Sequence, residues 1–209
     1  MQSLKGTAAS RVVLFLSDSR PPYSVTEIAA HSQVSAATAS KVVSLLEREA
    51  LVVKEERGTV SDVLWADLIR RWTQDYAVLR SNVSSGYLEP RGVSALVEKL
   101  RSANLKYALS GTLASATSVA PARLALLYTP DADLAATKLG LRHVDVGANV
   151  IVLEPFDDVV FFRTRSQDGL VTAALSQVAA DLLTSPGRGP TEGEELLQWM
   201  SANEDEWRN

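Results

Sequence analysis

The sequence predicts an α+β protein with two domains, and three observations support this fold class. The chain has 209 residues, which is long for one ordinary domain and sufficient for two. Apolar residues at helical spacing dominate the N-terminal part, and the segment LVVKEERGTVSDVLW then alternates as hairpins do. Farther along, short apolar β-branched segments alternate with helical ones, as in a mixed α/β domain. We expect an N-terminal domain over 1–65, a connecting helix over 66–85, a mixed α/β domain over 86–201 and a solvated tail over 202–209.

The composition restricts the classes of function. The chain lacks cysteine, which excludes disulfide bonds and thiolate metal ligands, and its two histidines, His31 and His143, have no partner at metal-ligand spacing. We therefore expect no metal, no cofactor and no catalytic residue. We find no signal peptide and no apolar segment long enough to span a bilayer, so we expect a cytoplasmic protein without a membrane partner.

Three helices and a hairpin are expected in the N-terminal domain. The first helix, around RVVLFL, is stopped by two prolines, and SVTEIAAHS begins a second helix with Ser24 or Thr26 as its N-cap. A short turn, SQV, leads into a third helix over 35–49, and the following hairpin turns at Arg57 and Gly58. This order of elements is typical of a winged helix-turn-helix.

The third helix has two different compositions. Its second half is apolar, whereas its first half contains only small residues, hydroxyls and a lysine. A recognition helix enters the major groove with its first turns, where small side chains permit close approach and hydroxyls hydrogen-bond to bases or phosphates. The alternative is a core helix whose serine-rich first turn faces solvent. We favour binding to double-stranded DNA, and the expected contact residues are Thr26, Gln33, Ser35, Ala36, Ala37, Thr38, Ser40 and Lys41, with Lys54 and Arg57 from the hairpin.

The distribution of charge agrees with this interpretation. The formal net charge is −4, but residues 1–65 contain seven basic and seven acidic side chains, whereas residues 86–209 contain eleven and sixteen. The acidic excess therefore lies away from the N-terminal domain, which is free to approach a polyanion. Arg70 and Arg71 are expected on a solvated helix face, the alternative being a contact with phosphate.

The second domain is expected to have a nucleotidyltransferase-like topology that lacks the metal carboxylates. The strand KYALS ends at Gly111 and Thr112, and a turn of this kind can bind phosphate when it opens a helix. Nucleotidyl transfer also requires carboxylates on the next strand to hold divalent metal, and ARLALLY has none. Asp131 and Asp133 follow only after Pro130, where capping a helix is the simpler role.

The remaining segments of this domain predict further elements. TLASATSV and TEGEELLQWM are expected to be helices, the latter with a capping box between Thr191 and Glu194, and NVIVLEP and DVVFFR are expected to be strands. Glu154, Asp157 and Asp158 lie near one strand end, where turn residues are expected in preference to an acidic site.

Four segments of the chain resemble actinobacterial AbiEi-type antitoxins, the antitoxin and regulator half of type IV toxin–antitoxin systems. They are RRWTQDYAVLRSN, YALSGTLASA, ARLALLYTPDADLAATKLGLRHVDVGANVIVLEPFDDVVFFRT and SQVAADLLTSPGRGPTEGEELLQWM. The resemblance covers roughly residues 10–201, and GANVIVLEPFD and DLLTSPGRGPTEGEELLQWM are its most specific parts. It implies an N-terminal winged helix-turn-helix that binds inverted repeats in its own promoter. It also implies a C-terminal domain that neutralises a nucleotidyltransferase-like toxin.

We therefore expect a sequence-specific transcriptional repressor that acts as an antitoxin. Its expected partners are an operator and a cognate toxin, and self-association of the protein is compatible with binding to inverted-repeat DNA. Two other functions are considered. One is a stand-alone regulator that binds a small molecule between the strands and helices of residues 86–200. The other is a nucleotidyltransferase with a DNA-binding arm, whose activity would depend on Asp131 and Asp133.

Overall fold

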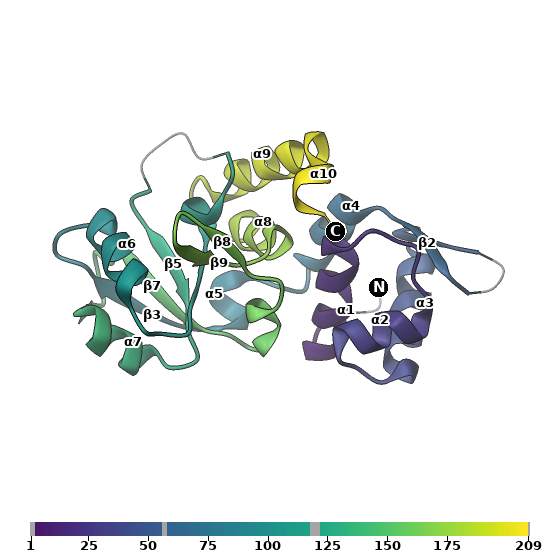
Figure 1. The fold of residues 1–209 in the computed structure, drawn as a ribbon, viewed down its shortest axis with the longest axis horizontal. Coiled ribbons are helices and arrows are strands. Elements are labelled where there is room, and N and C mark those ends of the chain that lie inside the picture. Colours follow the sequence, from purple (N-terminus) through teal and green to yellow (C-terminus); the bar gives the residue numbers. More distant parts are fainter. Residues whose placement is uncertain (1–2, 56–57, 118–121, 209) are drawn as a thin grey trace. The chain divides into compact units, whose positions relative to one another are not determined.

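The computed structural model describes residues 3–55, 58–117 and 122–208 and shows an α+β chain with a mixed β-sheet (Figure 1). The chain forms two compact units. Unit 1 contains residues 1–76 and 197–209, and unit 2 contains residues 77–196. Within the described ranges, no helix combines the length and the apolar character that a membrane crossing requires.

Unit 1 begins with three helices, α1 (Thr7–Asp18), α2 (Val25–Ser32) and α3 (Ala36–Arg48). They are followed by strands β1 (Val52–Lys54) and β2 (Val60–Val63) and by helix α4 (Trp65–Trp72). The four helices share a core, to which Leu16, Ile28, Val43, Leu46 and Leu68 contribute side chains without measurable exposure. Trp72 belongs to this core and donates a hydrogen bond from Nε1 to the hydroxyl of Ser10 at 3.2 Å.

Strands β1 and β2 form an antiparallel pair in which Val52 lies opposite Val63, with a bulge between Val53 and Lys54. The chain before α2 adds a bridge to the same pair. The backbone N–H of Tyr23 donates to the carbonyl of Val60 at 3.0 Å, and the Val60 N–H donates to Tyr23 at 2.8 Å. This bridge ties the hairpin to the start of α2, a connection that the alternating sequence pattern alone did not predict.

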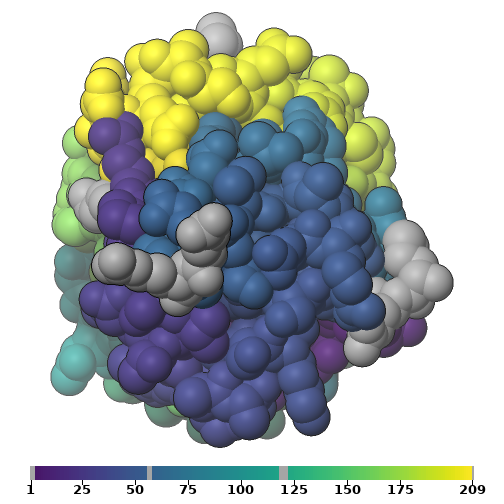
Figure 2. Space-filling view, turned by 90° about the vertical axis from the view of Figure 1, so that its right-hand side faces the viewer, coloured from purple at the N-terminus to yellow at the C-terminus, as the bar shows by residue number. Residues whose placement is uncertain are grey.

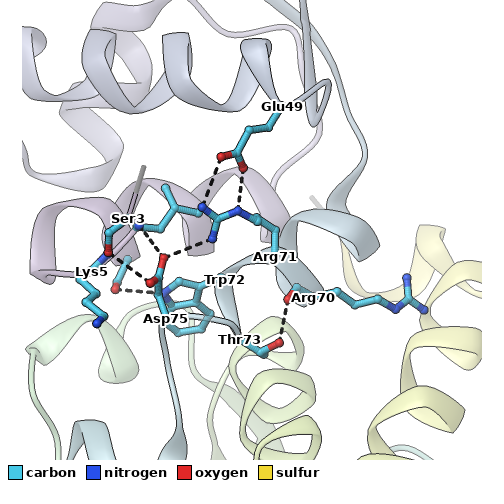
Figure 3. Close-up of polar contacts among 10 residues, drawn as sticks. Ser3, Lys5, Glu49, Arg70, Arg71, Trp72, Thr73 and Asp75 are labelled. Carbon is cyan, nitrogen blue, oxygen red and sulfur yellow. Dashed lines mark hydrogen bonds and ion pairs between the residues drawn. The ribbon is translucent and has the colours of Figure 1, made fainter. Parts of the chain in front are cut away.

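A buried ion cluster joins α4 to the end of α3 (Figure 3). The Arg71 guanidinium donates from Nε and Nη2 to both carboxylate oxygens of Glu49, at 2.7 and 3.3 Å, and from Nη1 to Asp75 at 3.2 Å. Asp75 also accepts a hydrogen bond from the backbone N–H of Leu4 at 2.7 Å. The expectation that Arg71 lies on a solvated face is therefore wrong, whereas Arg70 is partly exposed and pairs with Asp67 at 3.0 Å.

The C-terminal residues are part of unit 1. Helix α10 (Glu204–Trp207) places the Trp207 ring edge-on against Trp65, with the ring centroids 4.8 Å apart. Arg208 donates to the carbonyl oxygens of Leu16 and Ser17, both at 3.1 Å, so it satisfies groups at the end of α1. The expected solvated tail is therefore wrong for these residues, because an indole and a guanidinium are buried here.

Unit 2 is built on a seven-stranded sheet with the order β6-β3-β7-β5-β4-β9-β8. The strands are β3 (Val83–Leu88), β4 (Ala108–Ser110), β5 (Ala125–Tyr128), β6 (Arg142–His143), β7 (Val150–Glu154), β8 (Arg165–Gln167) and β9 (Leu170–Thr172). β5 pairs with β7, and β4 with β9, in parallel, and the other neighbours are antiparallel. Helices cover both faces of this mixed sheet (Figure 1).

The two faces bury different side chains. Helices α6 (Val93–Ser102) and α7 (Ala132–Leu139) pack on the face that carries Leu109, Leu127 and Val152, which form an apolar cluster with Leu96 and Leu100. Helices α5 (Val78–Ser81), α8 (Leu175–Leu183) and the first turns of α9 (Gly189–Ala202) lie on the other side. There the side chains of Ser110 and Tyr128 hydrogen-bond to Asp181 of α8.

Several predicted elements differ from the structure. The connecting helix expected over 66–85 is replaced by two helices, α4 and α5, and strand β3, which begins at Val83. The segment expected as a strand at DVVFFR is the 3-10 helix η2 (Asp158–Phe161), and TLASATSV begins with the short 3-10 helix η1 (Gly111–Ala114), its last residues lying outside the described part of the chain. Helix α9 starts at Gly189, so Thr191 lies inside it and does not cap it.

Candidate nucleic-acid interface

The connection between α2 and α3 is a tight, hydrogen-bonded turn. Ser24 caps α2 by accepting a hydrogen bond from the Glu27 N–H, and the Glu27 carboxylate accepts one from the Ser24 N–H at 2.7 Å. This hydrogen bond from the backbone of Ser24, together with one from the Ser24 hydroxyl, lowers the pKa of Glu27. At the other end Gln33 adopts the left-handed conformation, with φ 53° and ψ 46°, and its N–H bonds back to α2. The turn therefore fixes the direction in which α3 leaves α2.

Helix α3 has one buried side and one open side. Ala39, Val42, Val43, Leu45 and Leu46 are buried in the core of unit 1. The expected contact residues Ser35, Ala36, Ala37, Ser40 and Lys41 are all exposed, and Thr38 is half-buried. Atoms of α3 lie at the surface of unit 1 in the space-filling view (Figure 2). The two compositions within this helix thus correspond to two sides of it, an apolar one in the core and a small, hydroxylated one in solvent.

Ser35 has a structural role that limits its part in an interface. Its hydroxyl accepts a hydrogen bond from the Thr38 N–H at 3.1 Å and lies 2.8 Å from the Thr38 hydroxyl. Ser35 is thus the N-cap of α3, and its side chain is already engaged within the helix. Ala36, Ala37, Ser40 and Lys41 remain as the open surface of the first two turns.

Replacing Ser35 by alanine should lower the free energy of unfolding by about 1 kcal/mol, because the Thr38 N–H loses its acceptor. Ser35→Asp should retain most of the stability, since a carboxylate also accepts at an N-cap. Urea denaturation followed by circular dichroism measures both changes. Equal stability of the alanine and aspartate variants would contradict the capping role.

The hairpin and the start of α2 supply the other expected contacts. Lys54 of β1 is not free for phosphate, because its ammonium pairs with Glu47 of α3 at 2.8 Å. Thr26 is exposed in the first turn of α2, and Gln33 is exposed at the turn, where its side-chain oxygen lies 3.5 Å from Arg11. Arg57 lies outside the described residues. The structure therefore places Thr26, Gln33 and the open side of α3 on consecutive elements. Lys54 could contact a phosphate only after releasing Glu47.

Two basic residues near this surface were missed by the sequence analysis. Arg11 of α1 contacts Gln33 in the turn, and Arg48 is exposed in the last turn of α3, where its Nε donates to the Ser44 carbonyl at 3.3 Å. An arginine on the first helix gives no local signal of this position, because only the packing of α1 against α2 brings it to the turn. Arg48 lies two helical turns after Lys41 and therefore on the same side of α3, so it could have been identified from this spacing.

Asp131, which was considered as a metal ligand, and Glu154 and Asp157, which were considered as an acidic site, have structural roles in unit 2. Asp131 is the N-cap of α7 and accepts a hydrogen bond from the Leu134 N–H at 2.8 Å, as its position after Pro130 suggested. Asp157 accepts from the Val159 N–H at 2.9 Å and so caps η2, and Glu154 accepts from the Ala132 N–H at 3.1 Å. Over the ranges that the structure covers, no three histidine, aspartate or glutamate side chains gather in a way that could hold a metal ion.

Comparisons of this chain with protein-family models, with curated proteins and with solved structures gave no match.

Proposed function

We propose that the protein is a sequence-specific transcriptional repressor that binds double-stranded DNA through unit 1. In this proposal unit 1 is a winged helix-turn-helix, α3 is its recognition helix and the β1–β2 hairpin is its wing. The resemblance to AbiEi-type antitoxins extends the proposal to a toxin partner, and that extension rests on the resemblance alone.

The division of α3 into a buried side and an open side is the observation that carries the proposal. Ala36 and Ala37 present little more than a methyl group each, so the backbone of the first turn can approach base edges closely. One turn later Ser40 and Lys41 offer a hydroxyl and an ammonium, which suit bases and phosphates.

The hydrogen-bonded turn before α3 provides the rigidity that a recognition helix requires. Capping at Ser24 and Ser35 and the left-handed Gln33 hold α2 and α3 at a fixed angle. Four cations of α1, α3 and β1 can contribute phosphate contacts: the exposed Lys41 and Arg48, the half-buried Arg11 and, after release from Glu47, the half-buried Lys54. Because such contacts release counterions, the affinity should fall steeply as salt increases.

The proposal is tested by footprinting on the DNA upstream of the protein's own gene, followed by gel-shift assays with the protected duplex at fixed salt. Ser40→Glu combined with Lys41→Glu should weaken binding at least about a hundredfold, because two carboxylates replace a hydroxyl and a cation beside phosphates. The protein should remain folded, since both side chains are exposed.

The matched control is Thr137→Glu combined with Lys138→Glu on α7 of unit 2. These neighbouring helical residues are also exposed, and the change in net charge is the same. Operator affinity should then stay within about twofold of the wild type, since α7 belongs to unit 2 and not to the unit to which the proposal assigns DNA binding. Equal losses in both double variants, or no protected sequence at all, would reject α3 as a recognition helix.

A further inference from the structure

We propose that unit 2 contains a binding site for a small organic monoanion with an apolar body, in a cavity between the sheet and helices α8 and α9. The proposal concerns residues 77–196 alone and does not depend on binding of DNA by unit 1. The cavity has a volume of about 750 Å³, which lies in the range of sites for small molecules and cofactors.

The floor of the cavity is apolar. Leu126 of β5 and Ile151 of β7 line it from the sheet, Leu182 lines it from α8, and Leu79 lines it from α5. These strands lie next to each other at the centre of the sheet, so the floor is held by a continuous hydrogen-bonded ladder. Such a surface suits an aliphatic or aromatic body and gives nothing to a sugar or another strongly hydrated group.

Close packing of glycines keeps the walls in place. A Cβ atom on Gly189 would lie 2.6 Å from Ser185 Cβ and 2.7 Å from the Leu182 carbonyl oxygen, and one on Gly193 would lie 2.9 Å from Leu183. The start of α9 therefore touches the end of α8 through backbone. A cavity bounded by such contacts is preformed, which reduces the entropy that a ligand must overcome on binding.

The charges of the lining select the class of ligand. Arg123 and Arg188 are exposed at the cavity, and Glu192 is the one carboxylate among its described lining residues. Glu192 accepts a hydrogen bond from the Thr112 hydroxyl at 2.7 Å, and the Arg188 Nε lies 3.9 Å from its other oxygen. Two guanidinium groups and one carboxylate leave a formal charge of +1, which a single negative charge neutralises.

The two arginine side chains differ in their ion-pair partners. Arg188 already has Glu192 nearby, whereas Arg123 has no ion-pair partner within the residues that the structure describes. A guanidinium binds a carboxylate through two parallel hydrogen bonds, so Arg123 is the group best placed to receive the ligand's anion. The Thr112–Glu192 pair adds an acceptor and so disfavours ligands with several negative charges, such as polyphosphates.

The test uses the full chain, isothermal titration calorimetry and three probes of one shape: 2-naphthoate, neutral 2-naphthalenemethanol and cationic 2-naphthylmethylamine. One molecule of 2-naphthoate should bind per chain, at least about tenfold more tightly than the alcohol, as expected for one charge-assisted contact. The amine should bind more weakly still. Equal affinity for the acid and the alcohol, or no heat from 2-naphthoate at millimolar concentration, would overturn the proposal.

Two variants locate the bound molecule. Arg123→Gln combined with Arg188→Gln should reduce the affinity for 2-naphthoate about tenfold and leave that for the alcohol unchanged, whereas Arg142→Gln, an exposed arginine on β6, should change neither. Ile151→Trp should place an indole ring on the apolar floor, where the ring of the probe would lie, and so abolish binding of both probes. Wild-type affinity for 2-naphthoate in the glutamine double variant, or in a folded Ile151→Trp variant, would refute this site.

Discussion

Replacing Arg71 by alanine should destabilise the protein by about 3 kcal/mol, a loss typical of breaking a buried ion pair. The Arg71 side chain is only 8% exposed, and its partners Glu49 and Asp75 are 21% and 15% exposed. Without the guanidinium these two carboxylates would remain poorly hydrated and without their common cation (Figure 3). Urea denaturation monitored by tryptophan fluorescence measures the loss, since Trp65 and Trp72 are buried in the same unit.

The neighbouring residue provides the control. Arg70 lies on the same helix and also pairs with an aspartate, Asp67, but the two side chains are 42% and 61% exposed. Exposed pairs contribute little, so Arg70→Ala should change the free energy of unfolding by no more than about 0.5 kcal/mol. If the two alanine variants lost equal stability, the ion cluster would not be what stabilises this end of unit 1.

The cluster also predicts how stability changes with pH. Burial alone would raise the pKa of Asp75, but hydrogen bonds from the Leu4 N–H, Arg71 and Ser3, with the attraction of Arg71, lower it below its ordinary value. A carboxyl group whose pKa is lower in the folded state stabilises the fold above its unfolded pKa of about 3.9. That contribution is lost as the pH falls through the lower folded value. The Arg71→Ala variant should therefore lose less additional stability on acidification than the wild type.

The local structure of α2 and α3 could be predicted from the sequence because its signals are local. Ser24 and Ser35 precede helical apolar patterns, and both cap the helices that follow them. The apolar residues of α3 lie in the core with Ala39, whereas Ala36, Ala37 and Ser40 are exposed. The sequence could not show which partners the polar side chains have. Ser35 is hydrogen-bonded to Thr38, and Lys54 forms an ion pair with Glu47.

The failures arose where long-range contacts decide the local structure. The helical spacing of apolar residues continues past Trp72, yet α4 ends there, and Asp75 is held by Arg71 and by the distant Leu4 N–H. The segment VSSGYL has few apolar residues but forms β3, where Gly86 allows close approach, since a Cβ there would lie 2.9 Å from the Val144 carbonyl oxygen. Neither contact is visible in the residues of the segment itself.

Two further differences have similar causes. DVVFFR has the composition of a strand, but Asp157 caps a 3-10 turn there, and Val159 and Val160 are buried within that turn. The last residues were expected to form a solvated tail. Trp207 and Arg208 are nevertheless buried, since Trp65 and the end of α1 provide partners far away in the sequence.

The largest effect is expected from Asp181→Ala in unit 2, with a loss of about 4 kcal/mol, because several buried donors that share one acceptor group are left without it. Asp181 has no exposed surface. Its carboxylate accepts hydrogen bonds from the Ser110 hydroxyl at 2.5 Å, from the Tyr128 hydroxyl at 2.9 and 3.0 Å, and from the Gln177 amide nitrogen at 2.8 Å. The group thus connects α8 to the adjacent strands β4 and β5. Thermal and urea denaturation of the full chain should both register the loss.

Ser176 provides a control on the same helix, because it is as deeply buried as Asp181 but its hydroxyl is not hydrogen-bonded in the described structure. Ser176→Ala removes a buried polar group that gains nothing from its surroundings, so stability should be unchanged or should rise by up to about 1 kcal/mol. A comparable loss in both variants would mean that α8 is sensitive to any change of volume. Loss in Asp181→Ala alone would assign the stability of this helix on the sheet to the carboxylate and its three donors.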